Sequence, residues 1–191
     1  MVLIVMQKGA RKHMTSDKIV RTFPEIEGIK SEDLKGKVIK IWQRAIDIGK
    51  WDDIEDIPFY PKIPKDTVNL VKHLRAVTNH SLKMAEIMNS FYSYNVNTDF
   101  VIAGALLHDV CKAVEYSSKG GKAAIGDLTT HGTYGVHLCL EVGMPVEVTH
   151  IVASHTKKMG LTPKIIEAII VHYCDIGDAQ AIGLKNGLDF L

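Results

Sequence analysis

The chain has 191 residues, 46% hydrophobic and 24% charged, which is typical of one globular domain that can bury its own core. Its 23 basic and 22 acidic residues leave a net charge of +1, so composition gives no basic footprint for stable nucleic-acid binding. The three cysteines, at positions 111, 139 and 174, lack CxxC spacing, which argues against a zinc ribbon and against a disulfide framework.

The first thirty residues carry few structural signals. Residues 2–5 are apolar and predict a short strand or a tail that packs on the rest of the protein. They are too few for a signal peptide, and no later stretch approaches the length of a membrane helix. We therefore expect a cytoplasmic protein with no membrane partner. Residues 22–28 contain a proline and a glycine and predict a turn.

An amphipathic helix is predicted over residues 31–48. Ser31 is a suitable N-cap, apolar residues follow at helical spacing, and Gly49 is a suitable stop. Residues 51–64 are acidic and then proline-rich, which indicates a linker or extended loop. We therefore divide the chain into an N-terminal extension, residues 1–65, and a C-terminal domain. The amphipathic helix could cover that domain or a second copy of it, so a homo-oligomer is one assembly that the sequence allows.

The C-terminal domain, residues 66–191, is predicted to be a series of helices. No alternating strand pattern of useful length appears in it. A loop is expected where glycines and lysines gather, at residues 115–130. The predicted fold class is therefore all-α, with helices at residues 66–91, 100–109, 131–142 and 145–155, and a last helix that starts at Pro163 and runs past Asp175.

The most informative stretch is residues 100–112, which read F-V-I-A-G-A-L-L-H-D-V-C-K. Eight apolar or small residues predict a buried helix, with suitable N-cap residues just before it. His108 and Asp109 end this helix, and Lys112 lies one turn beyond His108. Because unpaired buried charge is costly, these groups need partners, and a metal ion is a suitable one. The alternative is a core histidine beside a satisfied aspartate.

Five successive helical segments each carry a histidine, an aspartate or both. Helical bundles build metal sites from such inward-facing side chains. Imidazole and carboxylate ligands without thiolate suit iron, manganese, nickel, cobalt or zinc. One divalent transition-metal ion could be held by four ligands, and two further histidines would allow a second ion with Asp109 as the bridge. The first four are His80, His108, Asp109 and Asp175, and the two further ligands are His131 and His155.

The other candidates near these positions are interpreted as supporting or solvent-facing residues. His73 shares a predicted helix with His80 and is expected to be solvated. Asp178 is expected to face solvent. His172 lies one turn before Asp175 and is kept as a reserve ligand.

The order of the six ligands and the residues around them resembles the HD superfamily of metal-dependent phosphohydrolases. L-L-H-D-V-C-K is similar to the frequent L-L-H-D-I-G-K of that family, while H-G-T-Y-G-V-H-L and V-H-Y-C-D-I-G-D-A resemble its second-metal and closing-aspartate segments. The resemblance covers roughly residues 66–185. It implies an HD-domain helical bundle in which these six residues bind metal and Lys112 lies beside the phosphate. Thr156 and the lack of a Gly-Tyr-Pro signature argue against cyclic-dinucleotide activity.

The resemblance implies a phosphomonoesterase or phosphodiesterase. A metal-bound hydroxide would attack the phosphorus of a small phosphorylated substrate, such as a nucleotide. Asp109 and Lys112 are the expected catalytic residues, with Lys112 offsetting the developing charge. Two alternatives stay open: a di-iron oxygenase that uses the same six ligands, and a non-catalytic module that binds a nucleotide.

Overall fold

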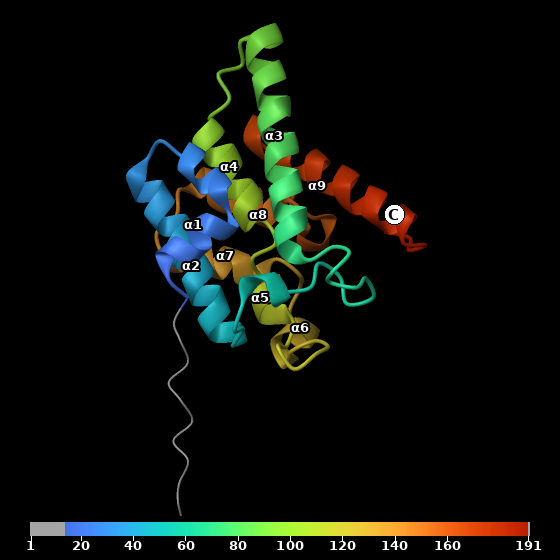
Figure 1. Ribbon diagram of the computed structural model, residues 1–191. Helices are drawn as coiled ribbons and strands as arrows, with labels where there is room; N and C mark the ends of the chain where they lie inside the picture. Colours follow the sequence, from blue (N-terminus) through green and yellow to red (C-terminus); the bar gives the residue numbers. More distant parts are fainter. Residues whose placement is uncertain (1–13, 191) are drawn as a thin grey trace, which may run out of the picture.

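A computed structural model describes residues 14–190, and every regular element within them is helical (Figure 1). The all-α fold class is therefore confirmed, and only two isolated β-bridges, Pro58 with Asn69 and Tyr116 with Lys122, interrupt the helical pattern of this part of the chain. The strand or tail expected at residues 2–5 lies outside the described residues. None of the described helices is long and apolar enough to cross a lipid bilayer.

Helix α4 (Thr98–Leu107) lies at the centre of the bundle. It contacts four other helices, α2 (Glu32–Gly49), α3 (Leu70–Tyr92), α8 (Val146–Ser154) and α9 (Ile166–Lys185). Its residues from Val101 to Leu107 are all buried, as the apolar run predicts. The Asn97 side chain caps its first turn by accepting hydrogen bonds from the backbone N–H groups of Asp99 and Phe100. The helix that carries the His-Asp pair is thus fixed in the core before the pair begins.

The N-terminal extension packs against this central helix. Short helices α1 (Ser16–Thr22) and η1 (Pro24–Gly28) lead into α2 (Glu32–Gly49), which Ser31 caps by accepting from the backbone N–H of Leu34. Residues 14–57 share one hydrophobic core with α4, α7 and α8. A boundary at residue 65 stays a prediction.

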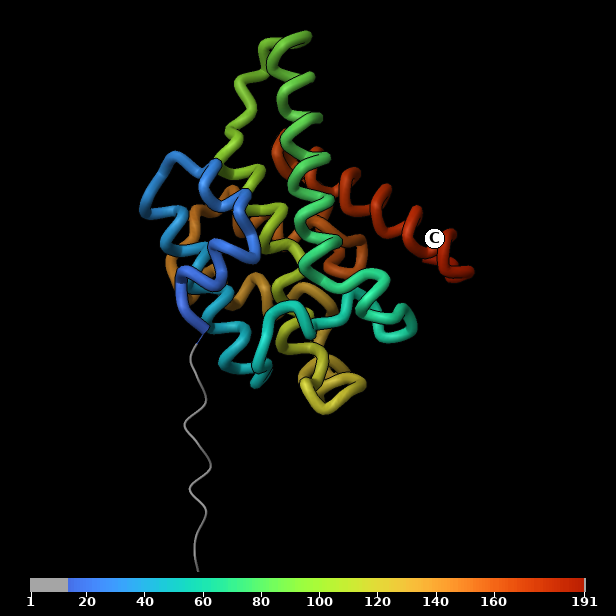
Figure 2. The backbone as a smooth tube through the Cα atoms, viewed as in Figure 1, coloured from blue at the N-terminus to red at the C-terminus, as the bar shows by residue number. Residues whose placement is uncertain are grey.

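Helices α3 (Leu70–Tyr92) and α9 (Ile166–Lys185) pack on each other and on α4, on the side away from α1 and α2 (Figure 1). Helix α3 begins four residues later than the sequence predicts, because residues 64–68 form turns and Asn69 supplies the cap. Its far end extends beyond the rest of the bundle (Figure 2).

Short helices connect these elements on the side of the metal ligands. They are η2 (Ile54–Asp56), α5 (Lys112–Glu115), α6 (Ala124–Leu128), α7 (Thr133–Glu141), α8 (Val146–Ser154) and η3 (Lys157–Met159). The loop expected at residues 115–130 therefore contains one helix, α6. Helix α7 begins after His131 rather than at it, since Gly132 has a φ of 92°, a conformation that glycine adopts without strain.

Candidate metal centre

Five helices bring their histidine and aspartate side chains together in two adjacent groups. The first group is His73, His108 and Asp175, and the second is Asp109, His131 and His155. In each group the ligand atoms all lie within 4.8 Å of one another. Three of these residues lie next to helix ends: His108 follows α4, His131 precedes α7 and His155 follows α8.

In the first group, both histidines lie close to the same oxygen of Asp175. Nε2 of His73 lies 3.2 Å from Oδ1 of Asp175, and Nε2 of His108 lies 3.4 Å from the same oxygen. The two Nε2 atoms are 3.2 Å apart. Both rings are buried, with 1% of His73 and none of His108 exposed, so these three donors face one another away from water.

The carboxylate of Asp109, a member of the second group, also faces the histidines of the first group. Its Oδ1 is 3.0 Å from Nε2 of His131 and 3.7 Å from Nε2 of His155. Its Oδ2 is 3.6 Å from Nε2 of His73 and 3.7 Å from Nε2 of His108. Each oxygen thus faces one pair of histidines, which is the arrangement expected of a bridging ligand.

Two of the four rings are oriented by the helices that they terminate. Nδ1 of His108 lies 2.7 Å from the carbonyl oxygen of Ala105, and Nδ1 of His155 lies 2.7 Å from that of Val152. The last carbonyls of a helix have no partner within the helix, so they accept from these rings. Nδ1 then carries the proton, and Nε2 presents a lone pair to the centre.

The other two rings are oriented by carboxylates. Nδ1 of His73 lies 2.7 Å from Oδ2 of Asp178, and Nδ1 of His131 lies 2.8 Å from Oε2 of Glu115. The backbone N–H of Gly132 donates to the other oxygen of Glu115, which holds that carboxylate in place. All four Nε2 atoms therefore face the centre, where they could bind metal.

The structure corrects the prediction of His80 as a ligand. His80 is exposed and outside both groups, whereas His73, which was expected to be solvated, is buried and belongs to the first group. The two residues are seven positions apart, which is close to two full turns, so they point to nearly the same side of α3. His80 lies about 10 Å further along the axis, beyond the level of the other ligands.

The expectation that Asp178 faces solvent was wrong, because this side chain is largely buried against His73. Sequence reasoning also missed Glu115, and it undervalued one signal for His73. His73 is flanked on its helix by buried Leu70, Leu74 and Val77, whereas His80 lies between Asn79 and Ser81. A histidine on the apolar face of a helix is buried and therefore needs a hydrogen-bonding or metal partner. A histidine among polar neighbours has less need of one. The reserve ligand His172 is buried, but its Nδ1 lies 2.7 Å from the backbone oxygen of His155, which places it beside the ligands.

Lys112 is buried beside the Asp109 carboxylate. Its Nζ lies 2.6 Å from Oδ2 of Asp109 and 4.3 Å from the ring centroid of Phe59. Burial alone would raise the pKa of the Asp109 carboxyl, but Lys112 and His131 hold that pKa well below its usual range. Asp109 is therefore ionised at neutral pH, as a metal ligand must be.

His155 is held in its neutral form. Burial, together with the neighbouring His108, lowers the pKa of His155 to about 4. At pH 7 the ring therefore does not carry a proton on Nε2, the atom that faces Asp109.

This donor set fits divalent transition metals. It offers four imidazole nitrogens with oriented rings and two carboxylates, and it contains no thiolate among the six ligands. His73, His108 and Asp175 would hold one ion, His131 and His155 would hold another, and Asp109 would contact both. Cys111 also lies near His131, with Sγ 3.6 Å from Nδ1, but that nitrogen faces away from the centre.

Comparison with known proteins agrees with this geometry. Residues 70–180 match the family model of the HD domain. The chain belongs to the HD domain family. His108 and Asp109 are its His-Asp pair, and the matched range contains all six residues of the two groups. HD domains bind divalent metal ions, and this one has histidine and aspartate groups that could do so.

One curated relative is similar over most of the chain. It is the dihydroneopterin 2',3'-cyclic phosphate phosphodiesterase of Methanocaldococcus jannaschii, with 35% identity over 175 residues. The match covers 81% of this HD domain protein and 66% of the relative, so the chain spans slightly less than two thirds of the relative's length. No solved structure matches the chain.

Proposed function

We propose that this HD domain protein is a metal-dependent phosphodiesterase that hydrolyses a small cyclic phosphodiester to a phosphomonoester. The observation that carries the proposal is the position of Asp109, with one carboxylate oxygen facing each pair of histidines. The relative from Methanocaldococcus jannaschii is a phosphodiesterase for a 2',3'-cyclic phosphate, which supports the choice of a phosphodiester.

Two metal ions held at this centre would polarise the phosphoryl oxygens and activate a water molecule. The hydrolysis itself adds the water oxygen to phosphorus, breaks one P–O ester bond and gives a proton to the leaving oxygen. The buried ammonium of Lys112 lies beside the bridging carboxylate and adds positive charge where the phosphoryl group gains negative charge.

The centre opens into a cavity of about 480 Å³, which is in the usual size range for small-ligand sites. Metal ligands form its floor, and Tyr116, Thr156 and Lys158 form part of its wall. Lys158 is exposed, so its ammonium is free to meet an anionic substrate at the entrance. A cavity of this size admits a nucleotide-sized molecule more readily than a nucleic-acid chain.

The test is hydrolysis of 2',3'-cyclic phosphates, with release of the phosphomonoester followed by chromatography. The metal-free protein is reconstituted without oxygen with Fe²⁺, Mn²⁺, Co²⁺, Ni²⁺ or Zn²⁺ in turn. We expect turnover with at least one metal, and a loss of about a thousandfold or more in Asp109→Ala, because a bridging ligand serves both ions.

His80→Ala is the matched control, since this histidine lies on the same helix as His73 but is exposed. It should keep full activity. Turnover that survives in Asp109→Ala, or no turnover of any phosphodiester with any of the five metals, would overturn the proposed function.

A further inference from the structure

Three aromatic side chains line one side of the cavity above the metal centre, and we call Phe59, Tyr60 and Phe190 the aromatic rim. The ring of Phe190 lies 5.1 Å from that of Tyr60 and 6.2 Å from that of Phe59, centroid to centroid. Both contacts are edge-to-face, with interplanar angles of 77° and 76°. The three rings therefore pack as one unit, although residue 190 lies 130 positions after residue 60 in the sequence.

Within the aromatic rim, only Tyr60 and Phe190 expose ring surface that a ligand could contact. Phe59 is 4% exposed, and its ring already contacts the His73 ring at 4.4 Å and the Lys112 ammonium at 4.3 Å. Tyr60 and Phe190 are half-buried and line the same cavity as Asp109. Phe59 thus supports the metal centre, while the other two rings face the space that a substrate would occupy.

The turn that follows α9 fixes the position of Phe190. The chain turns back at Gly187, which has a φ of 68°, and the N–H of Leu188 donates to the carbonyl oxygen of Gly183. A Cβ atom at Gly183 would lie 2.6 Å from Cδ2 of Phe190, so the ring packs where that residue has no side chain. This close contact fixes the ring against α9.

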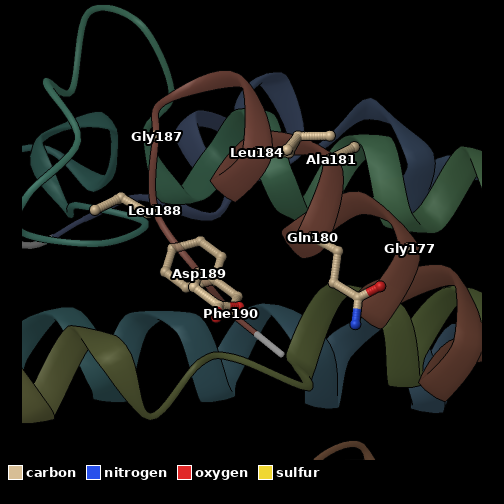
Figure 3. Close-up of a pocket in the computed structure, with 8 residues that line it drawn as sticks. All are labelled: Gly177, Gln180, Ala181, Leu184, Gly187, Leu188, Asp189 and Phe190. Carbon is tan, nitrogen blue, oxygen red and sulfur yellow. The ribbon is translucent and has the colours of Figure 1, made fainter.

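Phe190 also separates two hollows. The cavity of the metal centre lies on one side, and a hollow of about 660 Å³ along α9 lies on the other. Figure 3 shows the second hollow with Gln180 and Leu184 from α9 around it and Phe190 at its edge. The ring is therefore a wall of the active-site cavity rather than a side chain on open surface.

The aromatic rim lies outside the part of the chain that makes this an HD domain. The family match covers residues 70–180, and the rim is formed by residues 59, 60 and 190. The six residues of the two groups lie within the matched range, whereas this wall of the cavity comes from the flanking segments. A substrate contact in those segments would distinguish this protein's substrate from those of other HD domains.

We propose that Tyr60 and Phe190 bind the planar aromatic ring of the substrate and so select cyclic phosphodiesters that carry such a ring. Aromatic side chains bind heterocyclic rings by stacking and edge contacts, and removing one stacking partner usually weakens binding severalfold to a hundredfold. The proposal rests on the proposed function for the reaction, but the binding of the ring can be measured without it. A purine and a pterin share the chemistry that the rim recognises.

The kinetic test compares three probes with the same five-membered cyclic phosphate. They are adenosine 2',3'-cyclic phosphate, dihydroneopterin 2',3'-cyclic phosphate and glycerol 1,2-cyclic phosphate, which has no ring. We expect Tyr60→Ala and Phe190→Ala to raise KM roughly tenfold for the ring-bearing probe that the protein prefers. Their kcat/KM for the glycerol probe should stay within about twofold of the natural protein. The first two probes decide between a purine and a pterin.

Further variants separate ring binding from loss of folding. Tyr60→Phe should restore KM, because it keeps the ring and loses only the hydroxyl. Gly183→Ala should reproduce the Phe190→Ala effect, because the added Cβ displaces the Phe190 ring. Tyr92→Ala is the control, since Tyr92 is 60% exposed and stacks on Tyr94 at the far end of α3.

A binding measurement keeps this inference distinct from the proposed function. Equilibrium dialysis with adenosine 3'-phosphate, the corresponding neopterin phosphate and glycerol 2-phosphate needs no turnover. Tighter binding of a ring-bearing phosphate by the natural protein, lost in Tyr60→Ala and Phe190→Ala, supports the inference even if no probe is hydrolysed. Equal effects of these variants on ring-bearing and ring-free probes, or no effect on either, would overturn it.

Discussion

Asp178 accepts a hydrogen bond from Nδ1 of His73 across 2.7 Å and so joins α9 to the first turn of α3. Asp175, one turn earlier on α9, lies 3.2 Å from the other nitrogen of the same ring. One helix therefore both supplies a ligand of the first group and orients its neighbour.

Removing Asp178 should weaken metal binding without removing a ligand. Partners that orient a metal-binding histidine commonly contribute a factor of about 10 to 100 to metal affinity. We expect Asp178→Ala to lower the affinity of the first group by such a factor and Asp178→Asn to lower it less, because an amide oxygen still accepts from Nδ1. Competition with a metal-sensitive chelating dye measures this. Glu86→Gln, at an exposed position on α3, is the control, and an unchanged affinity in Asp178→Ala would contradict the assigned role.

His73 and His80 form a matched pair for testing the corrected ligand set. His73→Ala should remove the ion of the first group, since it deletes a buried donor that no nearby side chain replaces, and His80→Ala should leave metal content unchanged. Elemental analysis of the purified proteins gives the number of ions per chain. The opposite result, loss with His80→Ala alone, would restore the ligand set expected from sequence.

The second group can be emptied separately from the first. His131→Ala or His155→Ala should lower the metal content from about two ions per chain toward about one, because His73, His108 and Asp175 remain. Asp109→Ala should lower it further, since this carboxylate faces both groups. A content near one ion in the natural protein and in both histidine variants would show a single-metal centre.

Substitution of two glycines on α2 by alanine should change the free energy of unfolding in opposite directions. A Cβ at Gly49 would lie 1.8 Å from the carbonyl oxygen of Ala113, which accepts from Nε1 of Trp51, so Gly49→Ala should cost about 2–4 kcal/mol in the free energy of unfolding. Gly36 is exposed in mid-helix with nothing near its added Cβ, so Gly36→Ala should add about 0.5–1 kcal/mol. Denaturant titration of both variants checks the two signs, and similar stabilities would show that α2 and α5 are not packed this closely.

The three cysteines should differ in reactivity toward Ellman's reagent. Burial raises the pKa of Cys139 to about 12, and burial also raises that of Cys111 to about 11, so neither forms thiolate near pH 8. Cys174 is half-buried and should react first. We expect one thiol per chain to react rapidly in the native protein and three in guanidinium chloride. Rapid reaction of all three in the native state would show that the core around α4 and α7 opens readily.

The sequence predicts most of the bundle because capping residues and apolar runs indicate where the helices begin and end. The run before His108 is too apolar for any position but the core, and Asn97 and Ser31 cap the helices that follow them. Five of the six expected metal ligands lie in the two groups. Each of the five is close to a helix end or on the inward face of a helix, and the sequence pattern predicts both kinds of position. Their roles as ligands stay predictions until an ion is measured.

What sequence reasoning could not supply is the level of each residue along a helix. Helical periodicity gives the side on which His73 and His80 lie, and that side is nearly the same for both. Which of them contacts Asp175 depends on the position of α3 along its axis relative to α9. No local sequence pattern predicts this position. The roles of Asp178 and Glu115 were not predicted for a related reason, because these residues orient rings 105 and 16 positions away, and such distances leave no recognisable spacing in the sequence.

The spread of the ligands along the chain also has a consequence for biosynthesis. His73 precedes Asp175 by about a hundred residues, and the hydrogen bond from Asp178 depends on α9 being in place. A growing polypeptide that ends before residue 166 would contain Asp109 and all four histidines of the two groups, but it would lack Asp175 and Asp178. We therefore expect the first group to be completed only when α9 docks, in the same step that buries Ala168, Ile170 and Val171 in the hydrophobic core.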